Sequence, residues 1–236
     1  MLHNIREPQS LSRYITCIQS FQRYGPNQSF RCITYLHDNS VKVRGIKKDP
    51  VTYFKNPHGL NYSDLQESKY HDKIRERFHF DKFHIKLNAN IILQCLTHKS
   101  FAHGKVPYNE KLNLLGSQFL KFRSSIYTLN QTKSFNSLGS KDSRNMIHRD
   151  TLSQVIKDLG LRPMVFWKKR DPVRGATYNG EATILSTVLN SLVGAILIIN
   201  GETKATKFVD ELLLNKNSKH SLINATKDKI IEEEDK

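Results

Sequence analysis

Residues 109–120 read Asn-Glu-Lys-Leu-Asn-Leu-Leu-Gly-Ser-Gln-Phe-Leu, and this stretch predicts the central helix of the fold. The apolar residues that recur at helical spacing here are Leu112, Leu115, Phe119 and Phe122. This spacing predicts one apolar stripe along a helix from about 109 to 127. Gly116 lies within the stripe, where it lowers helix stability but allows another backbone to come close.

A second stretch, residues 186–195, reads Ser-Thr-Val-Leu-Asn-Ser-Leu-Val-Gly-Ala and lies within the most apolar run of the chain, 184–199. A membrane span needs about 20 predominantly apolar residues. This run is shorter, and it contains Ser186, Thr187, Asn190 and Ser191. We therefore expect a buried core helix and no membrane span.

The two stretches, with Leu-Thr-His-Lys-Ser-Phe at 96–101, resemble the motifs of the ribonuclease III endonuclease family. Its signature helix is usually written N-E-R-L-E-F-L-G-D-A-V-L, and its later helix carries a pattern like A-D-x-x-E-A-L-I-G-A. The resemblance extends from about residue 83 to 214, and a helix from about 89 to 101 is expected within it. It implies an all-α fold: a ribonuclease III endonuclease-like helical domain with an irregular basic N-terminal extension.

The resemblance also locates a catalytic site in which family members use carboxylates to hold Mg²⁺ against an RNA phosphodiester. Hard dications need anionic oxygen ligands, and two metals close together need several of them. The matching positions here are Glu110, Ser117, Thr187 and Asn190. Asn113 occupies the position of a further family acid that lies between the first two. Only Glu110 is acidic. We therefore expect a degenerate site with no catalytic residue, no metal and no cofactor, in a protein that is not an enzyme.

The formal net charge of +15 and the pI near 9.7 predict attraction to polyanions, first of all to nucleic acid. An anionic membrane surface and a merely soluble basic protein are the alternatives. The candidate RNA contacts are Lys99, Lys105, Lys111, Lys121, Arg123, Lys168, Lys169, Arg170 and Arg174, although each one alone also suits an ordinary solubilising charge. Trp167 either anchors this basic loop or stacks on a base, or it is buried beside solvated charges.

The three cysteines, Cys17, Cys32 and Cys95, form no C-x-x-C pair, and their odd number argues against a disulfide framework. Cys95, His98 and His103 lack a second pair of ligands, so we predict no zinc site.

The composition and motifs of the chain predict a division into four segments. Residues 1–37 contain one acid, Glu7, against four arginines and no lysine, which is typical of a mitochondrial presequence. The alternative is a basic arm that stays on the protein and lies along RNA. Residues 38–82 form an extension with one helix, which a capping box at 63–66 opens. The ribonuclease III-like domain occupies 83–214, and 215–236 form a polar C-terminal tail too short for a double-stranded RNA-binding domain.

Together these features favour a structural constituent of the mitochondrial large ribosomal subunit, in the matrix. The chain resembles the ribonuclease III-related proteins of that subunit in fungi, which implies rRNA and other mitochondrial ribosomal proteins as partners. The resemblance further implies a homodimer, or a heterodimer with another ribonuclease III-like chain. The small residues Thr187, Ser191, Gly194 and Ala195 suit either such an interface or close packing within one chain. The alternatives are an active double-stranded-RNA endonuclease and a free mitochondrial RNA-processing factor.

Overall fold

The computed structural model describes residues 54–66, 68–171, 173–175 and 177–226, which all belong to the unit formed by 47–236. Within these ranges the chain forms helices and loops, and its extended pairings are isolated bridges, Lys55 with Asn61 and Thr97 with Phe166. The prediction of an all-α fold is therefore confirmed. The expected presequence or basic arm at 1–37, and the extension as far as residue 53, lie outside the described residues.

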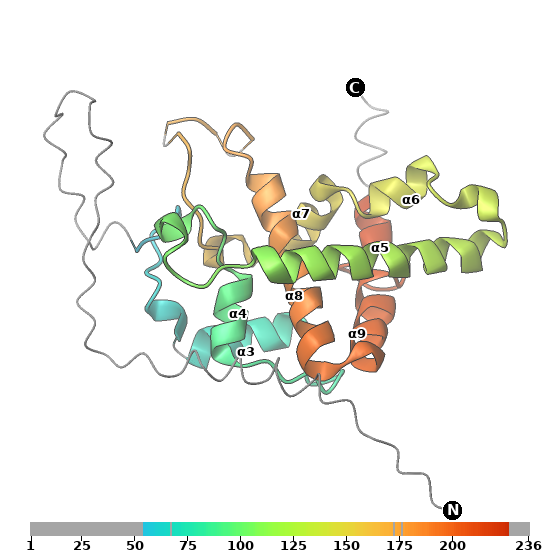
Figure 1. Cartoon of the computed structure of the whole chain (residues 1–236), viewed down its shortest axis with the longest axis horizontal. Coiled ribbons are helices and arrows are strands. Elements are labelled where there is room, and N and C mark those ends of the chain that lie inside the picture. Colours follow the sequence, from blue (N-terminus) through green and yellow to red (C-terminus); the bar gives the residue numbers. More distant parts are fainter. Residues whose placement is uncertain (1–53, 67, 172, 176, 227–236) are drawn as a thin grey trace, which may run out of the picture. The chain divides into compact units, whose positions relative to one another are not determined.

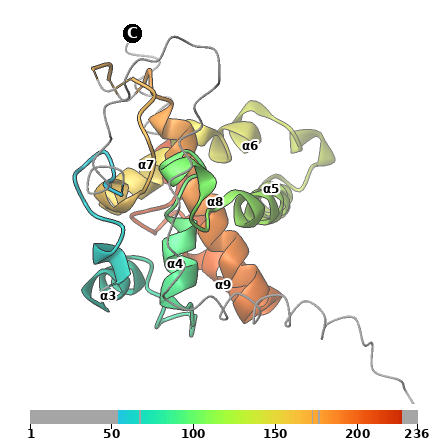
Figure 2. The same cartoon turned by 60° about the vertical axis from the view of Figure 1, so that its left-hand side comes forward.

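Figures 1 and 2 show helix α8 running through the middle of the described helices, with α5 lying across it. The α-helices are α3 (Ser68–Arg77), α4 (Ala89–Cys95), α5 (Glu110–Thr132), α6 (Lys141–Met146), α7 (Arg149–Asp158), α8 (Glu181–Asn200) and α9 (Glu202–Phe208). Short 3-10 turns lie at η2 (Asp64–Gln66), η3 (Phe101–Gly104), η4 (Phe135–Ser137) and η5 (Arg162–Met164), and α9 continues into a π-helical turn, η6 (Val209–Leu213).

Helix α8 is the hydrophobic centre of the fold and packs against α4, α5, α7 and α9. Its side chains at Leu185, Val188, Leu189, Leu192 and Val193 are completely buried. Among the described residues α8 is the one helix long and apolar enough to cross a membrane, and most of it is buried inside the protein. A helix that is apolar on nearly all sides belongs in a core. The prediction of a core helix is confirmed.

The crossing of α5 and α8 depends on two glycines. A Cβ added to Gly116 would lie 1.8 Å from the carbonyl oxygen of Asn190, and one added to Gly194 would lie 2.2 Å from that of Leu112. The two backbones are therefore in direct contact, as the position of Gly116 predicted. Gly194 serves packing within the chain, which was one of the two interpretations left open by the sequence.

The apolar stripe predicted along α5 is wrong at two of its positions. Phe119 and Leu120 are buried, but Leu115 is 38% and Phe122 56% exposed, and Leu114 is 65% exposed. The buried residues of α5 instead include Gly116 and small polar residues such as Ser124, whose hydroxyl donates to the Lys121 carbonyl of the same helix. Small polar residues that bond their own helix can pack in a core, so apolar spacing alone misidentified the buried face.

Three predicted helix boundaries also differ. The helix expected to open at 63–66 is divided into η2 and α3. The helix expected from 89 to 101 ends at Cys95, because the next residues pair with Phe166. The helix expected from 109 to 127 continues to Thr132 and ends where Lys133 adopts a left-handed conformation, φ 55°.

The packed core does not end at Leu214. Helical residues 222–226 follow a turn, and their Leu222 is completely buried against the main core. The Ser221 hydroxyl donates to the Leu213 carbonyl at 3.3 Å and so links this last helical segment to the end of η6. The first part of the expected polar tail therefore belongs to the core, whereas residues 227–236 lie outside the described residues.

Candidate functional site

The contact between α5 and α8 brings two of the sequence-predicted positions, Asn113 and Asn190, together. Helix α5 carries Glu110, Asn113 and Ser117, and α8 carries Thr187 and Asn190. The Nδ2 of Asn190 donates to the Oδ1 of Asn113 at 3.1 Å. Residues 77 positions apart are thus in direct contact at a point that the two glycines set.

A second link between the same regions involves Asn109, which the sequence analysis had not selected as a site residue. Its side chain is buried, and its Nδ2 lies 3.2 Å from the Thr187 hydroxyl and 3.2 Å from the Cys95 carbonyl. The Thr187 hydroxyl in turn donates to the Ile184 carbonyl at 2.7 Å. Because these groups bond to one another, they stabilise the junction of α4, α5 and α8.

Glu110 is the one carboxylate at these positions, and it is already paired. It is the first residue of α5, where the positive end of the helix dipole favours an acid. Its Oε1 accepts a hydrogen bond from Lys99 Nζ at 2.9 Å, and both side chains are more than half exposed. This hydrogen bond and the charge of Glu110 raise the pKa of Lys99, which favours the charged ammonium.

Ser117 does not take part in the links between the helices. Its hydroxyl donates to the Leu114 carbonyl of its own helix at 2.8 Å. The Oδ1 of Asn190 is buried and has no hydrogen-bond partner among the described residues, which is costly for a polar atom. The site is therefore an amide and hydroxyl junction with one surface ion pair at its edge.

This donor set does not fit the Mg²⁺ that a ribonuclease III site would hold. Mg²⁺ requires oxygen ligands in octahedral geometry and usually at least one available carboxylate. Glu110 is the only anion at these positions and carries its own counterion, Lys99, and the Oδ1 of Asn113 already accepts from Asn190. The unpartnered Oδ1 of Asn190 is a neutral amide oxygen and does not replace a carboxylate. In the part of the chain that the structure describes, no three His, Cys, Asp or Glu side chains gather as a metal site.

Cys95 and His98, considered above as zinc ligands, have structural surroundings. Cys95 is completely buried, its Sγ donates to the Ser191 carbonyl at 3.4 Å, and burial raises the pKa of its thiol. His98 Nδ1 accepts from the backbone N–H of Ser100 at 3.2 Å, and burial lowers its pKa, with the charge of Lys99 acting in the same direction. His98 is therefore neutral at physiological pH.

Some of the candidate RNA contacts are brought together by backbone pairing. Residues 96–98 run beside 166–168: His98 N donates to the Phe166 carbonyl at 2.8 Å, and Phe166 N to the Leu96 carbonyl at 2.9 Å. The backbone N–H of Lys168 also donates to the Ser100 hydroxyl at 3.1 Å. Lys99 and the basic loop that begins at Lys168 are consequently neighbours.

The remaining candidates have different surroundings. Lys105, Lys111 and Lys121 are exposed, as are Lys168, Arg170 and Arg174, whereas Lys169 is half-buried. Arg123 is only 17% exposed and forms an ion pair with Asp210, whose Oδ1 lies 3.2 Å from the arginine Nε. Trp167 is 2% exposed, so the interpretation that it is buried is correct and it cannot stack on a base.

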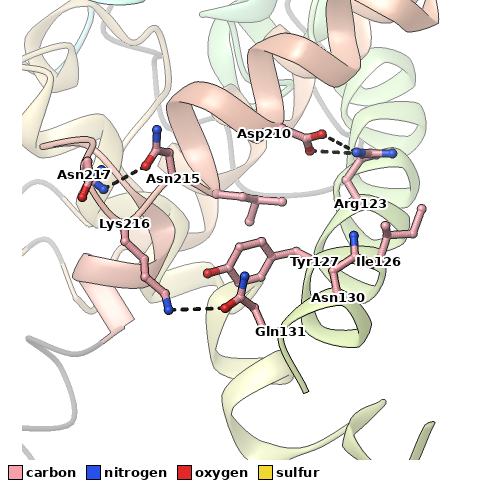
Figure 3. A pocket seen from close by; sticks show the side chains of 10 residues that line it. Arg123, Ile126, Tyr127, Asn130, Gln131, Asp210, Asn215, Lys216 and Asn217 are labelled. Atoms are coloured by element: carbon pink, nitrogen blue, oxygen red, sulfur yellow. Dashed lines mark hydrogen bonds and ion pairs between the residues drawn. The ribbon is translucent and has the colours of Figure 1, made fainter. Parts of the chain in front are cut away.

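Arg123 belongs to a polar pocket that the sequence analysis missed. Figure 3 shows this pocket between the second half of α5 and the segment that follows α9, with Arg123 directed at Asp210 and Lys216 directed at Gln131. Its volume is about 480 Å³, and it is lined by Arg123, Ile126, Tyr127, Asn130, Gln131, Asp210 and Leu214–Asn217. No spacing signal could have revealed it, because its two walls lie about 80 residues apart in the sequence.

Comparisons with known proteins define the class. Residues 88–217 match the family model described as Ribonuclease-III-like. The match covers more than half of the chain, and this protein belongs to the ribonuclease-III-like family.

Curated relatives include both enzymes and a ribosomal protein. The chain is 27% identical to Ribonuclease 3 of Tropheryma whipplei over 131 residues, which are 54% of this chain and 58% of the relative. It is 25% identical to the large ribosomal subunit protein mL57 of Neurospora crassa over 141 residues, 51% of this chain and 52% of the relative. The chain thus spans a little over half the length of the curated relatives it matches. Among solved structures, the ribonuclease III nuclease domain of Campylobacter jejuni aligns with a TM-score of 0.47 and 22% identity, over 64% of this chain and 97% of that chain.

Proposed function

We propose that this chain is a structural constituent of the mitochondrial large ribosomal subunit that binds rRNA through a ribonuclease III-like domain without cleaving it. The relationship to a large ribosomal subunit protein supports the ribosomal role. The net charge of +15 supports binding to a polyanion, since lysine and arginine neutralise phosphates without a metal site. The arginine-rich, acid-poor composition of residues 1–37 supports the mitochondrial location.

The proposal that the chain does not cleave RNA rests on Glu110 and on the residues at the other positions of the family acids. The carboxylate that a metal would need is paired with Lys99 at 2.9 Å, and the positions of the other family acids hold a serine, a threonine and an asparagine. Neutral amides and hydroxyls cannot offset the charge of a dication. The α5–α8 junction is kept by hydrogen bonds between these neutral groups, so the framework persists without the reaction.

A cleavage assay tests this part of the proposal. The folded chain is incubated with duplex RNA at millimolar Mg²⁺ or Mn²⁺, beside an active bacterial ribonuclease III as positive control. We expect no metal-dependent cleavage, and no difference between the native chain and Glu110→Ala. Cleavage that Glu110→Ala abolishes would establish the alternative, an active endonuclease, and refute the proposal.

Sedimentation tests the ribosomal part. Native protein from isolated mitochondria is fractionated on a gradient at high salt, which weakens contacts that rest on charge alone. We expect it to move with the large subunit in a stoichiometric amount. A predominantly free pool would instead support a mitochondrial RNA-processing factor, and absence from mitochondria would contradict both.

We further propose that the exposed apolar face of α5 pairs with a second copy of this chain. Leu114 and Leu115 lie about two turns before Phe122 on that helix, and the three are 65%, 38% and 56% exposed. A two-fold axis across one helix makes such a face self-complementary, since each residue meets the same surface of the partner. Full burial of an exposed large apolar side chain contributes roughly 1.5–3 kcal/mol, and each of these three would contribute less because it is already partly buried.

A further inference from the structure

An exposed arginine and an exposed tyrosine form a pair on the loop that precedes α8. The guanidinium carbon of Arg174 lies 4.2 Å from the centre of the Tyr178 ring. Tyr178 is 52% exposed, and the Arg174 side chain is 59% exposed. Both planar groups therefore present surface to solvent, and neither contributes to the core.

Asn179 holds this pair in place. Its side chain is nearly buried, its Oδ1 accepts from Asp171 N at 2.8 Å, and its Nδ2 lies 2.9–3.0 Å from the carbonyl oxygens of Asp171, Arg174 and Gly175. Asp171 adds a second set of bonds: its Oδ1 accepts from Val173 N at 2.9 Å, and its Oδ2 lies 3.4 Å from Arg174 Nε. A loop organised in this way loses little entropy when it binds a ligand.

The two ends of the loop are also fixed. At one end the Lys168 N–H donates to Ser100. At the other end Glu181, the first residue of α8, has a side chain 6% exposed and accepts two hydrogen bonds from Arg162, at 2.8 and 3.0 Å. Lys168 is therefore anchored to Ser100 before the pair, and Glu181 is anchored to Arg162 of η5 after it.

We propose that Arg174 and Tyr178 form a stacking platform for an unpaired base of RNA. Aromatic rings and guanidinium planes both stack on bases, and a base is available for stacking only where it leaves the duplex. Lys168 and Arg170, which precede the pair in the same loop, are exposed and would neutralise the flanking phosphates. RNA is favoured over an acidic protein because the platform offers flat stacking surfaces as well as positive charge. This inference rests on the proposed function, since it specifies which feature of the RNA the chain reads.

The test compares two RNA hairpins that differ only in one bulged nucleotide, with binding to the full chain followed by fluorescence anisotropy. We expect the native chain to prefer the bulged hairpin. Tyr178→Ala should weaken binding to the bulged hairpin by about tenfold and leave the regular hairpin unchanged. The dependence of log affinity on log salt should keep its slope, because no cation is removed.

Three further variants separate stacking from other causes. Arg174→Lys keeps the charge but loses the planar group, so it should weaken only the bulged hairpin. Asn179→Ala should do the same, and should also speed amide hydrogen exchange in the loop. Phe135→Ala is the matched control, because it removes another exposed aromatic side chain, 81% exposed, from a different part of the chain and should have no effect.

The outcomes distinguish this inference from the proposed function. If Tyr178→Ala leaves the preference for the bulge intact, or weakens both hairpins equally, the platform is refuted while RNA binding stands. If the native chain binds neither hairpin, the proposed function itself is refuted and the platform with it.

Discussion

Gly116 of α5 and Gly194 of α8 lie at the same helix crossing. At each of these positions the backbone of the other helix is so close that only a hydrogen atom fits in place of a side chain. The Cβ position of Gly116 is 2.7 Å from the backbone nitrogen of Gly194, and that of Gly194 is 3.0 Å from the nitrogen of Gly116. This crossing determines how near Asn113 comes to Asn190. The spacing of the two helices therefore controls both the core and the site.

Gly116→Ala should destabilise the protein strongly. The added methyl group would meet the Asn190 carbonyl oxygen at 1.8 Å, so the two helices must separate. We expect a loss of about 3 kcal/mol in the free energy of unfolding, measured by urea denaturation followed by circular dichroism. Gly175→Ala is the control, since no atom lies within 4 Å of its Cβ position. Equal stability of the two variants would contradict the close crossing.

The sequence revealed part of this arrangement and concealed part. Gly116 within an apolar run indicated a close approach, and the approach is there. The same run did not show which face is buried, because Leu115 and Phe122 have the spacing of a core and are exposed. What decided the face was the second helix: only the side of α5 with Gly116 can come near enough to α8. Such a constraint depends on a partner far along the chain and is invisible in a local pattern.

Phe122→Glu should convert a dimer into a monomer. A charge placed in an apolar self-complementary face loses its hydration without gaining a partner. The association constant of the dimer should therefore fall by a factor of 100 or more, about 3 kcal/mol. Stability of the monomer should change by less than about 0.5 kcal/mol, because the side chain is 56% exposed. Light scattering coupled to gel filtration measures the mass.

Phe135→Glu provides the control for that experiment, because Phe135 is 81% exposed and lies off the apolar face of α5. It should leave the mass unchanged. A native chain that is monomeric at micromolar concentration would contradict pairing with a second copy. A monomer that forms a mixed dimer with another ribonuclease III-like chain would assign the same face to a different partner.

The motif positions include Asn113 and Asn190, whose side chains are hydrogen-bonded to each other, but the other bonds around them could not be predicted. The pairing of Glu110 with Lys99 requires the turn after α4, and the contribution of Asn109 requires a contact across 78 residues. Neither follows from periodicity. Tyr178 was missed for another reason: Trp167 is the more conspicuous aromatic residue, yet it is buried.

Acidification should destabilise the fold through His98. Burial lowers the pKa of this histidine below its ordinary value of 6.5, so the unfolded chain takes up a proton more readily than the folded chain. Stability should therefore fall as the pH decreases through 6.5. His98→Asn removes the titrating ring but keeps an acceptor for the Ser100 N–H, and its stability should fall less over the same range.

His58 and His220 also have pKa values lowered, first of all by burial, so the variant should retain part of the decrease. Thermal unfolding at pH 7.5 and pH 5.5 measures the difference. If native protein and His98→Asn lose the same stability between these values, His98 is not responsible.

Substitutions of Arg123 and Lys121 should affect different properties, the first the stability of the fold and the second the affinity for RNA, although both residues were predicted as RNA contacts. Arg123 is mostly buried and bonded to Asp210, so Arg123→Ala should lower stability by about 1 kcal/mol and leave RNA affinity nearly unchanged. A double-mutant cycle with Asp210→Ala measures the coupling directly. Lys121 is exposed, so Lys121→Ala should leave stability unchanged, weaken RNA binding a few-fold and reduce the salt slope by about one. The reverse pattern, with RNA affinity lost in Arg123→Ala alone, would mean that the Asp210 ion pair opens to admit a phosphate.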